Sequence, residues 1–254
     1  MQPIRVAVAG ATGKMGRELV RALVREHGFV LAGAIAAEKV GQDIGEVIGV
    51  EGGQVGVPIH ASMEDALRDG LKADVVVDFS VPAATRKTLP AAVAAGIAPV
   101  VGTTGFEPGE LERFAEVCRT GGLGGTFIAN YAVGVMLMMR FAEEARRFLP
   151  HAEIIELHHH TKLDAPSATA LRTQERLEKA MGDLAAPPVP VHSVRLPGMV
   201  AHQEVIFGGP GQTLTIRHDA PSREAYVPGI LMACKWVLKE KRTAFSLEEV
   251  AFSR

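Results

Sequence analysis

The sequence predicts an α/β protein in two parts: a doubly wound parallel sheet, then a smaller α+β part with a mixed sheet. Apolar runs at residues 4–9, 29–36, 74–80 and 98–105 alternate with helix-compatible stretches, which is typical of crossover units in a parallel sheet. A glycine-rich turn joins the first run to an amphipathic helix. After about residue 150, strand-like runs with partial polar alternation are joined by Gly and Pro turns.

The first strand and the helix after it are the best defined elements. Residues 4–9, IRVAVA, form an apolar run of the kind that parallel sheets bury on both faces. After the turn, apolar residues at helical spacing mark one buried face, and they are Met15, Leu19, Ala22 and Leu23. We expect this helix to run to about His27, with Gly28 ending it.

A later helical segment, residues 82–95, precedes the strand at 98–105 and contains a proline at position 90. Proline removes a backbone donor and clashes with the preceding helical turn. We therefore expect a helix that begins near Pro82, bends or restarts at Pro90 and ends at Gly96. Residues 126–130, TFIAN, add one more strand.

The second part has a different pattern. Its strand-like runs are residues 152–159, 191–198, 203–209 and 213–219. One clear helix lies among them, at about residues 167–181, so a mixed sheet is expected. The closing stretch 226–241 is helical, with an apolar face suited to packing on the first part.

Composition narrows the function. The 254 residues suit one large domain or two modest ones, and the change of pattern favours two. With 27 Lys plus Arg against 29 Asp plus Glu, the net charge of −2 argues against nucleic acid or an anionic membrane as a partner.

No apolar run approaches the roughly 18 residues of a transmembrane helix, and the N-terminus lacks the layout of a signal peptide. We therefore expect a cytoplasmic protein. Cys118 and Cys234 are too few for a disulfide framework or a zinc knuckle.

Gly10, Gly13 and Gly16 stand between the first strand and its helix. In a dinucleotide-binding turn, missing side chains let the backbone approach a pyrophosphate, which accepts hydrogen bonds from amides at the helix start. The spacing G-x-x-G-x-x-G is a variant of G-x-G-x-x-G, and the alternative is a tight turn that binds nothing. The surrounding crossover pattern favours a Rossmann-like domain that binds NADH or NADPH.

The residues that would distinguish the two cofactors are ambiguous. A carboxylate about 20 residues after the glycines would bind the 2′-hydroxyl of NADH. Ala36 and Ala37 stand where that residue is expected, followed by Glu38 and Lys39. Glu38 suits NADH and Lys39 suits the extra phosphate of NADPH, so both cofactors stay open.

Three segments lie at the ends of later strands: DFS (78–80), GTTG (102–105) and ANYAVG (129–134). Ligands of doubly wound sheets bind beyond the carboxyl ends of the strands, so these segments are candidates for the same cleft. Gly102, Thr103 and Thr104 offer amides and hydroxyls without bulk, which suits a nicotinamide ring and its ribose. The alternative for each segment is an ordinary turn with threonine as a helix cap.

Residues 156–170 read ELHHHTKLDAPSATA. Successive side chains on a strand point to opposite faces, so three neighbouring histidines do not converge on one ion. We therefore predict no metal site here. The second interpretation, ordinary surface polarity, does not account for the residues that follow.

Those residues describe a pocket for a carboxylate. Lys162 follows the histidines, and an Asp164 or Ser167 cap opens a helix. The first amides of that helix, near Ala168 and Thr169, form an anion site. Histidines, a lysine and a helix start together favour a carboxylate-bearing substrate with a proton donor at hand.

The pattern E-L-H-H-x-x-K-x-D-A-P-S-x-T-A, from Glu156 to Ala170, resembles the signature of the dihydrodipicolinate reductase family. The similarity covers nearly the whole chain through GATGKMGREL, VVDFS, GTTGF, IANYAVGV, HDAPSR and VPGI. It implies NAD(P)H-dependent reduction of 4-hydroxy-tetrahydrodipicolinate to tetrahydrodipicolinate, on the diaminopimelate route to lysine. It also implies a dinucleotide domain of residues 1–130 and 222–254, and a substrate-binding and oligomerisation domain of residues 131–221, usually within a homotetramer.

The resemblance assigns roles to residues. It implies that His158 is the general acid/base, that Lys162 is a second proton donor, and that His159 with the backbone at Ala168 and Thr169 holds the substrate carboxylates. Arg223 is a further candidate for that role. The implied dinucleotide contacts are Gly10, Ala11, Thr12, Gly13, Lys14, Met15, Gly102, Thr103, Thr104, Ala129, Asn130 and Tyr131.

Two positions depart from the family pattern: the Ala36–Ala37 pair described above, and position 168, where the family usually has glycine and this chain has Ala168. Alanine would be strained at a positive φ, so we predict that Ala168 occupies a helical N-terminal position instead.

Two other functions are kept as alternatives. One is another Rossmann-type oxidoreductase of amino-acid metabolism, for which a catalytic cysteine or another lysine arrangement is expected. The other is a non-enzymatic NAD(H)-sensing module.

Overall fold

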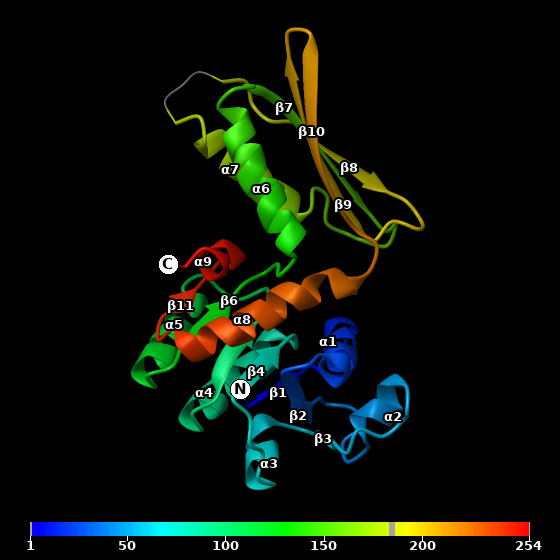
Figure 1. Ribbon diagram of the computed structural model, residues 1–254, viewed down its shortest axis with the longest axis vertical. Coiled ribbons are helices and arrows are strands. Elements are labelled where there is room, and N and C mark those ends of the chain that lie inside the picture. The colour runs from blue at the N-terminus through cyan, green and yellow to red at the C-terminus, as the bar shows by residue number, and fades with distance from the viewer. Residues whose placement is uncertain (1, 183–185, 254) are drawn as a thin grey trace. The chain divides into compact units, whose positions relative to one another are not determined.

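The computed structural model describes residues 2–182 and 186–253, and the chain divides into two compact units (Figure 1). Unit 1 is Met1–Tyr131 together with Tyr226–Arg254, and unit 2 is Ala132–Ala225. The sequence expectation places the divisions after residues 130 and 221, whereas the units divide after Tyr131 and Ala225.

Unit 1 contains a seven-stranded sheet in the order β11-β6-β5-β4-β1-β2-β3, and all of its strand pairs are parallel. Its strands are β1 Ile4–Ala9, β2 Phe29–Ile35, β3 Ile59–His60, β4 Val75–Asp78, β5 Ala98–Val101, β6 Gly125–Phe127 and β11 Thr243–Ala244. The winding reverses at β1, which pairs with β2 on one side and β4 on the other. This confirms the predicted doubly wound sheet, and the reversal is the point where such sheets bind ligands.

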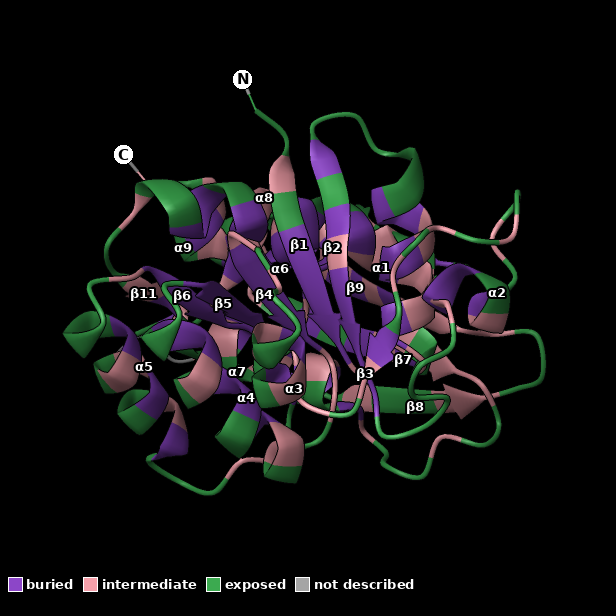
Figure 2. Cartoon of the chain, turned by 90° about the horizontal axis from the view of Figure 1, so that it is seen from below, coloured by how far each residue is buried: buried purple, intermediate pink, exposed green. Residues whose placement is uncertain are grey.

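The helices of unit 1 cover both faces of this sheet (Figure 2). They are α1 Lys14–Arg25, α2 Ile44–Ile48, α3 Met63–Arg68, α4 Pro82–Ala94, α5 Glu110–Thr120, α8 Val227–Lys239 and α9 Leu247–Ala251. Helix α8 contacts α1 and α9, while α4 contacts α3 and α5. Strands β4 and β5 are buried along their whole length, as expected for apolar runs covered on both sides.

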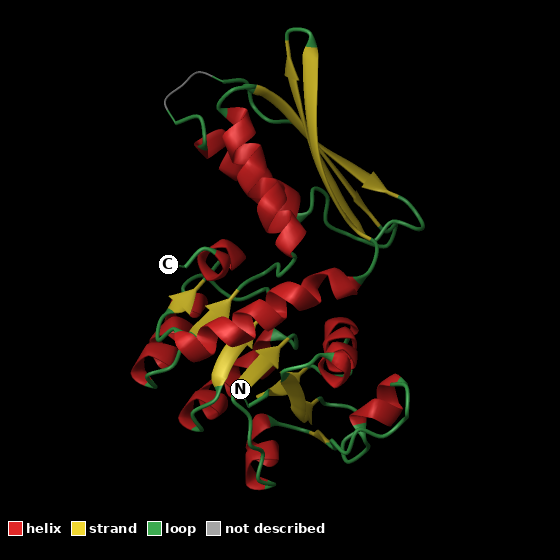
Figure 3. Cartoon of the chain, viewed as in Figure 1, coloured by secondary structure: helices red, strands yellow, loops and turns green. Residues whose placement is uncertain are grey.

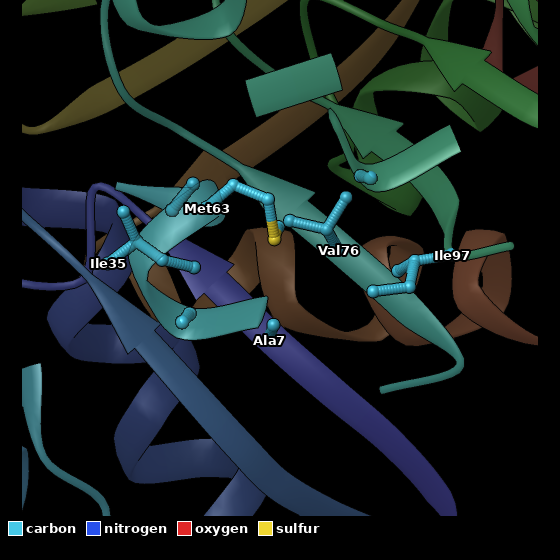
Figure 4. Close-up of a cluster of buried hydrophobic side chains, with 8 residues drawn as sticks. Ala7, Ile35, Met63, Val76 and Ile97 are labelled. Carbon is cyan, nitrogen blue, oxygen red and sulfur yellow. The ribbon is translucent and has the colours of Figure 1, made fainter. Parts of the chain in front are cut away.

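One core cluster shows how the helices are attached to this sheet. Met63 of α3 packs with Ala7, Ile35 and Val76 of the central strands and with Ile97, all 5% exposed or less (Figure 4). Alanine on β1 leaves room for the larger side chains around it, in line with the close packing of protein interiors. Two of these strands, β1 and β4, lead directly into the glycine turn and into residues 78–80.

Two helix predictions in unit 1 need correction. Helix α1 ends at Arg25 rather than at about His27, because Glu26 already has extended backbone angles (φ −79°, ψ 122°). Helix α4 continues through Pro90 to Ala94 as a single element, so the expected restart is wrong. Pro90 is exposed, and the Arg86 carbonyl that loses its intrahelical donor there can be hydrated by water.

Unit 2 contains a mixed sheet in the order β10-β9-β7-β8, in which only β7 and β8 run parallel (Figure 3). Its strands are β7 His151–His158, β8 Val191–Arg195, β9 Ala201–Gly209 and β10 Gln212–Ala220. Helices α6 Val133–Arg146 and α7 Ala168–Lys179 pack on one face over a core that includes Ile154, Val205 and Phe207. The 3₁₀ helix η1, Arg223–Tyr226, follows the sheet.

The mixed sheet and helix α7 are confirmed, whereas α6 is a second helix that the sequence pattern did not single out. Its first half carries Val133, Val135, Met136, Met138 and Met139. Apolar residues on several sides weaken the one-sided pattern by which amphipathic helices are recognised.

Candidate active site

The turn between β1 and α1 has no room for side chains at two of its glycines. Gly10 has a φ of +77°, and a Cβ there would lie 2.7 Å from the carbonyl oxygen of Phe79. A Cβ on Gly16 would lie 2.1 Å from the carbonyl oxygen of Gly10. Both distances are well inside van der Waals contact, so any larger residue would force the backbone of the turn to move.

The same turn ends in an uncapped helix start. Gly13 is the N-cap of α1, and no side chain caps the helix. Gly13 and Lys14 are exposed. First-turn amides carry the positive end of the helix dipole and bind phosphate oxygens. A close-packed glycine backbone next to an uncapped helix start therefore fits the pyrophosphate of a dinucleotide.

The ends of β4 and β5 are tied together by Asp78, which is 1% exposed. Its Oδ1 accepts hydrogen bonds from the Ser80 amide at 2.8 Å, the Ser80 hydroxyl at 2.6 Å and the Thr103 hydroxyl at 3.1 Å. Its backbone oxygen accepts a hydrogen bond from the Gly102 amide at 2.8 Å. The Thr103 hydroxyl is thus used in a hydrogen bond that joins the two strand ends, whereas the side chain of Thr104 is exposed and accessible to a ligand.

A pocket of about 430 Å³ lies beyond the ends of β5 and β6, within unit 1. Its lining is formed by residues 103–109, Leu111, Glu112, Phe127 and Ala129. Thr103, Thr104 and Ala129 are predicted cofactor contacts, and the structure brings these three together. The volume is in the range of small-molecule sites.

Tyr131 lies away from solvent. It is 1% exposed, and its hydroxyl lies 3.0 Å from Thr126 Oγ1 and donates to the Val101 carbonyl at 3.0 Å. Burial raises the pKa of the Tyr131 phenol, so it stays protonated. The side chain braces the end of the sheet, and only its backbone is suited to a cofactor contact.

The cofactor-discriminating region follows β2. Ala36 is buried, while Ala37, Glu38 and Lys39 are exposed. Lys39 has a φ of +60°, a conformation that costs a lysine roughly 1–2 kcal/mol. Both charged side chains therefore lie at the carboxyl end of β2, where an adenosine ribose is bound in folds of this kind.

In unit 2, His158 ends β7 and contacts a fully buried carboxylate. His158 Nδ1 lies 2.5 Å from Glu156 Oε2. Arg195, the β8 residue opposite His158, donates to both oxygens of Glu156, at 2.9 and 2.7 Å. The Ser167 amide donates to Glu156 Oε1 at 3.2 Å. One carboxylate thus links the histidine, an arginine and the start of α7.

The charges in this cluster affect one another. Burial raises the pKa of Glu156, but hydrogen bonds from Arg195, Ser193 and His158 outweigh it and lower that pKa to about 2. Burial lowers the pKa of His158; Glu156 opposes this effect, and the positive charges of Lys162 and Arg195 add to it. At neutral pH Glu156 is therefore a carboxylate and His158 an uncharged imidazole.

The loop between β7 and α7 carries the remaining predicted residues. Lys162 Nζ pairs with Asp164, and His159 Nδ1 lies 2.7 Å from Thr161 Oγ1. His160 is exposed. Arg223 opens η1 and is half-buried.

The start of α7 has the geometry that the sequence predicts. Ser167 is the N-cap, and its Oγ accepts a hydrogen bond from the Ala170 amide at 3.2 Å. Ala168 is the first residue of the helix and is absent from the positive-φ residues of the described chain. The predicted helical position of Ala168 is confirmed, so alanine is accommodated without strain.

Sequence reasoning missed two members of this cluster. Glu156 stands two residues before His158, so strand alternation alone places both side chains on one face of β7. Arg195 is 39 residues beyond Glu156. No local signal connects those two, and only the β7–β8 register brings them together.

Several other observations bear on the chemistry. Among residues 2–182 and 186–253, no group of three or more His, Cys, Asp or Glu side chains is arranged to hold a metal ion, and no helix is long and apolar enough to cross a bilayer. Cys118 and Cys234 are both buried, and burial raises the pKa of each thiol to about 12. Neither thiol is suited to act as a nucleophile.

The comparisons with known proteins agree over the whole chain. Residues 4–131 match the family model described as Dihydrodipicolinate reductase, N-terminus, and residues 134–251 match Dihydrodipicolinate reductase, C-terminus. The chain is 69% identical to 4-hydroxy-tetrahydrodipicolinate reductase of Symbiobacterium thermophilum, with 100% of both chains covered, and 44% identical to its namesake from Moorella thermoacetica, with 97% of each covered. A dipicolinate-bound dihydrodipicolinate reductase from a Paenisporosarcina species has a TM-score of 0.82 at 31% identity, covering 98% of this chain and 99% of that chain.

The doubly wound parallel sheet and the family matches identify a Rossmann-type oxidoreductase that uses NADH or NADPH. Both family models and both relatives identify the same group. The chain belongs to the dihydrodipicolinate reductase family, which confirms the resemblance drawn from residues Glu156 to Ala170.

Proposed function

We propose that this chain reduces 4-hydroxy-tetrahydrodipicolinate to tetrahydrodipicolinate, with NADH or NADPH, on the diaminopimelate route of lysine biosynthesis. The observation that carries the proposal is the cluster around His158, in which a buried carboxylate holds an uncharged imidazole close to Lys162. The relative that is 69% identical over the full chain bears the name of this activity.

The reaction takes up a hydride and a proton and releases water. NADH or NADPH supplies the hydride when it is bound. Elimination of water gives a proton to the departing hydroxyl and takes one from the adjacent ring carbon, and the conjugated imine that accepts the hydride then takes up one proton. The protein has to transfer these protons and to hold two carboxylates. His158 and Lys162 are the groups in unit 2 proposed for proton transfer, because an imidazole exchanges protons readily near neutral pH and an ammonium can donate one.

Binding of the substrate carboxylates is assigned to the loop after β7. Lys162 offers a charged donor, His159 a ring nitrogen, and Ala168 and Thr169 the amides at the start of α7. Arg223 of η1 is proposed as a further carboxylate contact. A dicarboxylate is thus matched by donors of both kinds, charged side chains and helix amides.

Cofactor binding is assigned to unit 1. The pyrophosphate would lie on residues 10–15, which lead from the glycine turn into α1, and the nicotinamide end on residues 102–104 and 129–131. Glu38 would accept a hydrogen bond from the 2′-hydroxyl of NADH, and Lys39 would pair with the 2′-phosphate of NADPH. Each of the two cofactors thus has one candidate partner among these neighbouring side chains, and both NADH and NADPH stay open.

We further propose a cytoplasmic homotetramer assembled through unit 2. Helices α6 and α7 cover one face of its sheet. Strand alternation places Ile155, Leu157 and Ile206 on the opposite face, and all three are partly exposed. Partly exposed apolar side chains on this sheet face, interspersed with Glu153, His202 and Glu204, support association with further copies of the chain. Light scattering during size-exclusion chromatography tests the assembly, and a monomer would contradict it.

The test of the activity is loss of absorbance at the NADH band with freshly generated 4-hydroxy-tetrahydrodipicolinate. We expect turnover with at least one of NADH and NADPH. Absence of turnover with both would reject the proposal. Turnover of other substrates only would favour another oxidoreductase of amino-acid metabolism, and cofactor binding without any turnover would favour an NAD(H)-sensing module.

A further inference from the structure

Glu156 is the point where four parts of unit 2 meet. It is fully buried on β7, yet it is ionised, because both of its oxygens face donors. Arg195 of β8 binds both oxygens, and the same guanidinium donates to the Asp164 carbonyl at 2.7 Å. The Ser167 amide at the start of α7 also donates to Glu156, at 3.2 Å. The pair Glu156–Arg195 therefore joins His158, the Lys162 loop and the helix start.

An ionised carboxylate can only accept hydrogen bonds. Because His158 Nδ1 lies 2.5 Å from Glu156 Oε2, the nitrogen that faces the carboxylate must carry the proton. The uncharged ring then exists as a single tautomer, with its lone pair on Nε2. A histidine free of such a partner would populate both tautomers, and only one of them presents Nε2 as the proton acceptor.

We propose that Glu156, held in place by Arg195, is a positioning residue of the reaction: it binds the Nδ1 proton of His158 and thereby leaves Nε2 as the atom that exchanges a proton with the substrate. This inference deepens the proposed function and rests on it for its kinetic consequences. In each turnover Nε2 gains one proton from solvent and passes one to the substrate, while the Nδ1 proton stays with Glu156. Arg195 keeps the carboxylate charged and oriented without touching the ring.

The charged groups that act on His158 come from three elements. Glu156 lies on the same strand, Arg195 lies on β8, and Lys162 lies on the loop before α7. Glu156 is the negative charge among them, and it favours the protonated ring, whereas the two cations oppose it. Its removal therefore changes both the tautomer of His158 and the pH at which the ring titrates. A purely structural ion pair would change neither.

The first experiment reads the tautomer directly in the wild-type protein and needs no activity. Histidine-selective ¹⁵N labelling resolves the ring nitrogens, and the signals of His158 are assigned by their loss in His158→Gln. At a pH above the titration of His158, we expect a protonated Nδ1 and an unprotonated Nε2. A protonated Nε2, or an averaged mixture of the two tautomers, would overturn the proposal.

The second experiment compares Glu156→Gln with the matched control Glu143→Gln. Glu143 also forms a two-bond pair with an arginine in unit 2, Arg176, but it contacts no histidine among the described residues. For Glu156→Gln we expect kcat to fall by about 10- to 100-fold, with KM for NADH changed by less than about threefold. In the profile of kcat against pH, the inflection caused by titration of His158 should move to lower pH, because the negative charge that favours the protonated ring is removed. Glu143→Gln should keep the wild-type inflection.

The outcomes separate this inference from the proposed function. If the wild-type protein does not turn over the substrate, the proposed function fails, and the ¹⁵N tautomer still decides the inference. If the wild type is active and Glu156→Gln keeps its kcat and its pH inflection, the inference fails alone. If Glu156→Gln does not fold, the His158 tautomer measured in the wild-type protein alone supports or overturns the inference.

Discussion

Lys162 and Asp164 form an ion pair in which the lysine Nζ donates to both carboxylate oxygens, at 2.6 and 2.7 Å. The Asp164 side chain is 58% exposed, and an ion pair of this kind contributes at most about 1 kcal/mol. A substrate carboxylate can therefore replace Asp164 on the same ammonium. The Lys162 ammonium is therefore positioned to bind an anion, and its ion pair with Asp164 is weak enough to be exchanged.

Lys162→Arg and Lys162→Met distinguish proton transfer from anchoring. Arginine keeps the charge but does not release a proton at neutral pH, so we expect Lys162→Arg to keep KM for the substrate within a few-fold and to lower kcat by about 100-fold or more. Lys162→Met should also raise KM by about tenfold or more, because a charged hydrogen bond is lost. Steady-state kinetics measure both effects. Wild-type kcat in Lys162→Arg would assign Lys162 to anchoring alone.

His158→Gln should lower kcat by about 10²- to 10⁴-fold, the range found for removal of a general acid/base. KM should change little, because the amide retains the size and polarity of the ring. His160→Gln is the matched control, since His160 is the exposed neighbour in the same sequence. The assignment is wrong if the His158 variant retains wild-type kcat or if the His160 variant loses as much.

Gly16→Ala should weaken cofactor binding by about tenfold or more, because the new Cβ would lie 2.1 Å from the Gly10 carbonyl and the turn would have to move. Gly208→Ala is the control, since a Cβ at Gly208 meets no atom within 4 Å. Titration of NADH fluorescence measures the binding constant of each variant. Unchanged NADH affinity in Gly16→Ala would show that this turn is not the pyrophosphate site.

Stability should fall on acidification through Glu156. Its pKa of about 2 in the folded protein lies below its ordinary value of 4.5. The stabilisation that goes with this depressed pKa is therefore fully present above about pH 4.5 and is lost as the pH falls from there toward 2. Urea unfolding at a series of pH values measures the effect, and Glu156→Gln should show a shallower decline below pH 4.5. Parallel curves for the two proteins would contradict the ionised state of Glu156.

Pro90→Ala should stabilise the protein by about 1–2 kcal/mol. Alanine restores the amide that can donate to the Arg86 carbonyl inside α4, and it removes the steric cost of proline in a helix interior. Part of this gain is offset, because proline also restricts the unfolded chain and alanine does not. Pro82→Ala is the matched control, because proline is favoured at the first helical position that Pro82 occupies. Denaturant unfolding of both variants provides the test; a gain in Pro82→Ala equal to that in Pro90→Ala would refute the explanation.

Local features of this chain were predictable from its residues. The run at residues 4–9 became β1, the glycine turn leads directly into α1, and Ser167 caps α7 so that Ala168 is helical. Each of these depends on neighbours within a few positions: a continuous apolar run, absent side chains, or a hydroxyl three residues before the amide it accepts from. The family, and with it the class of reaction, follows from the same continuous stretches.

What depends on distant residues was decided only by the tertiary structure. Pairing of β7 with β8 places Arg195 beside Glu156, and packing of β4 against β5 directs the Thr103 hydroxyl to Asp78. Glu156 is an ordinary acidic residue in the sequence. It becomes the buried partner of His158 because strand register brings an arginine from 39 residues away to balance its charge. The sequence by itself determined the chemical groups and the local backbone around them, and the fold determined their ionisation, because the pKa of a group depends on burial and on charges brought close in space.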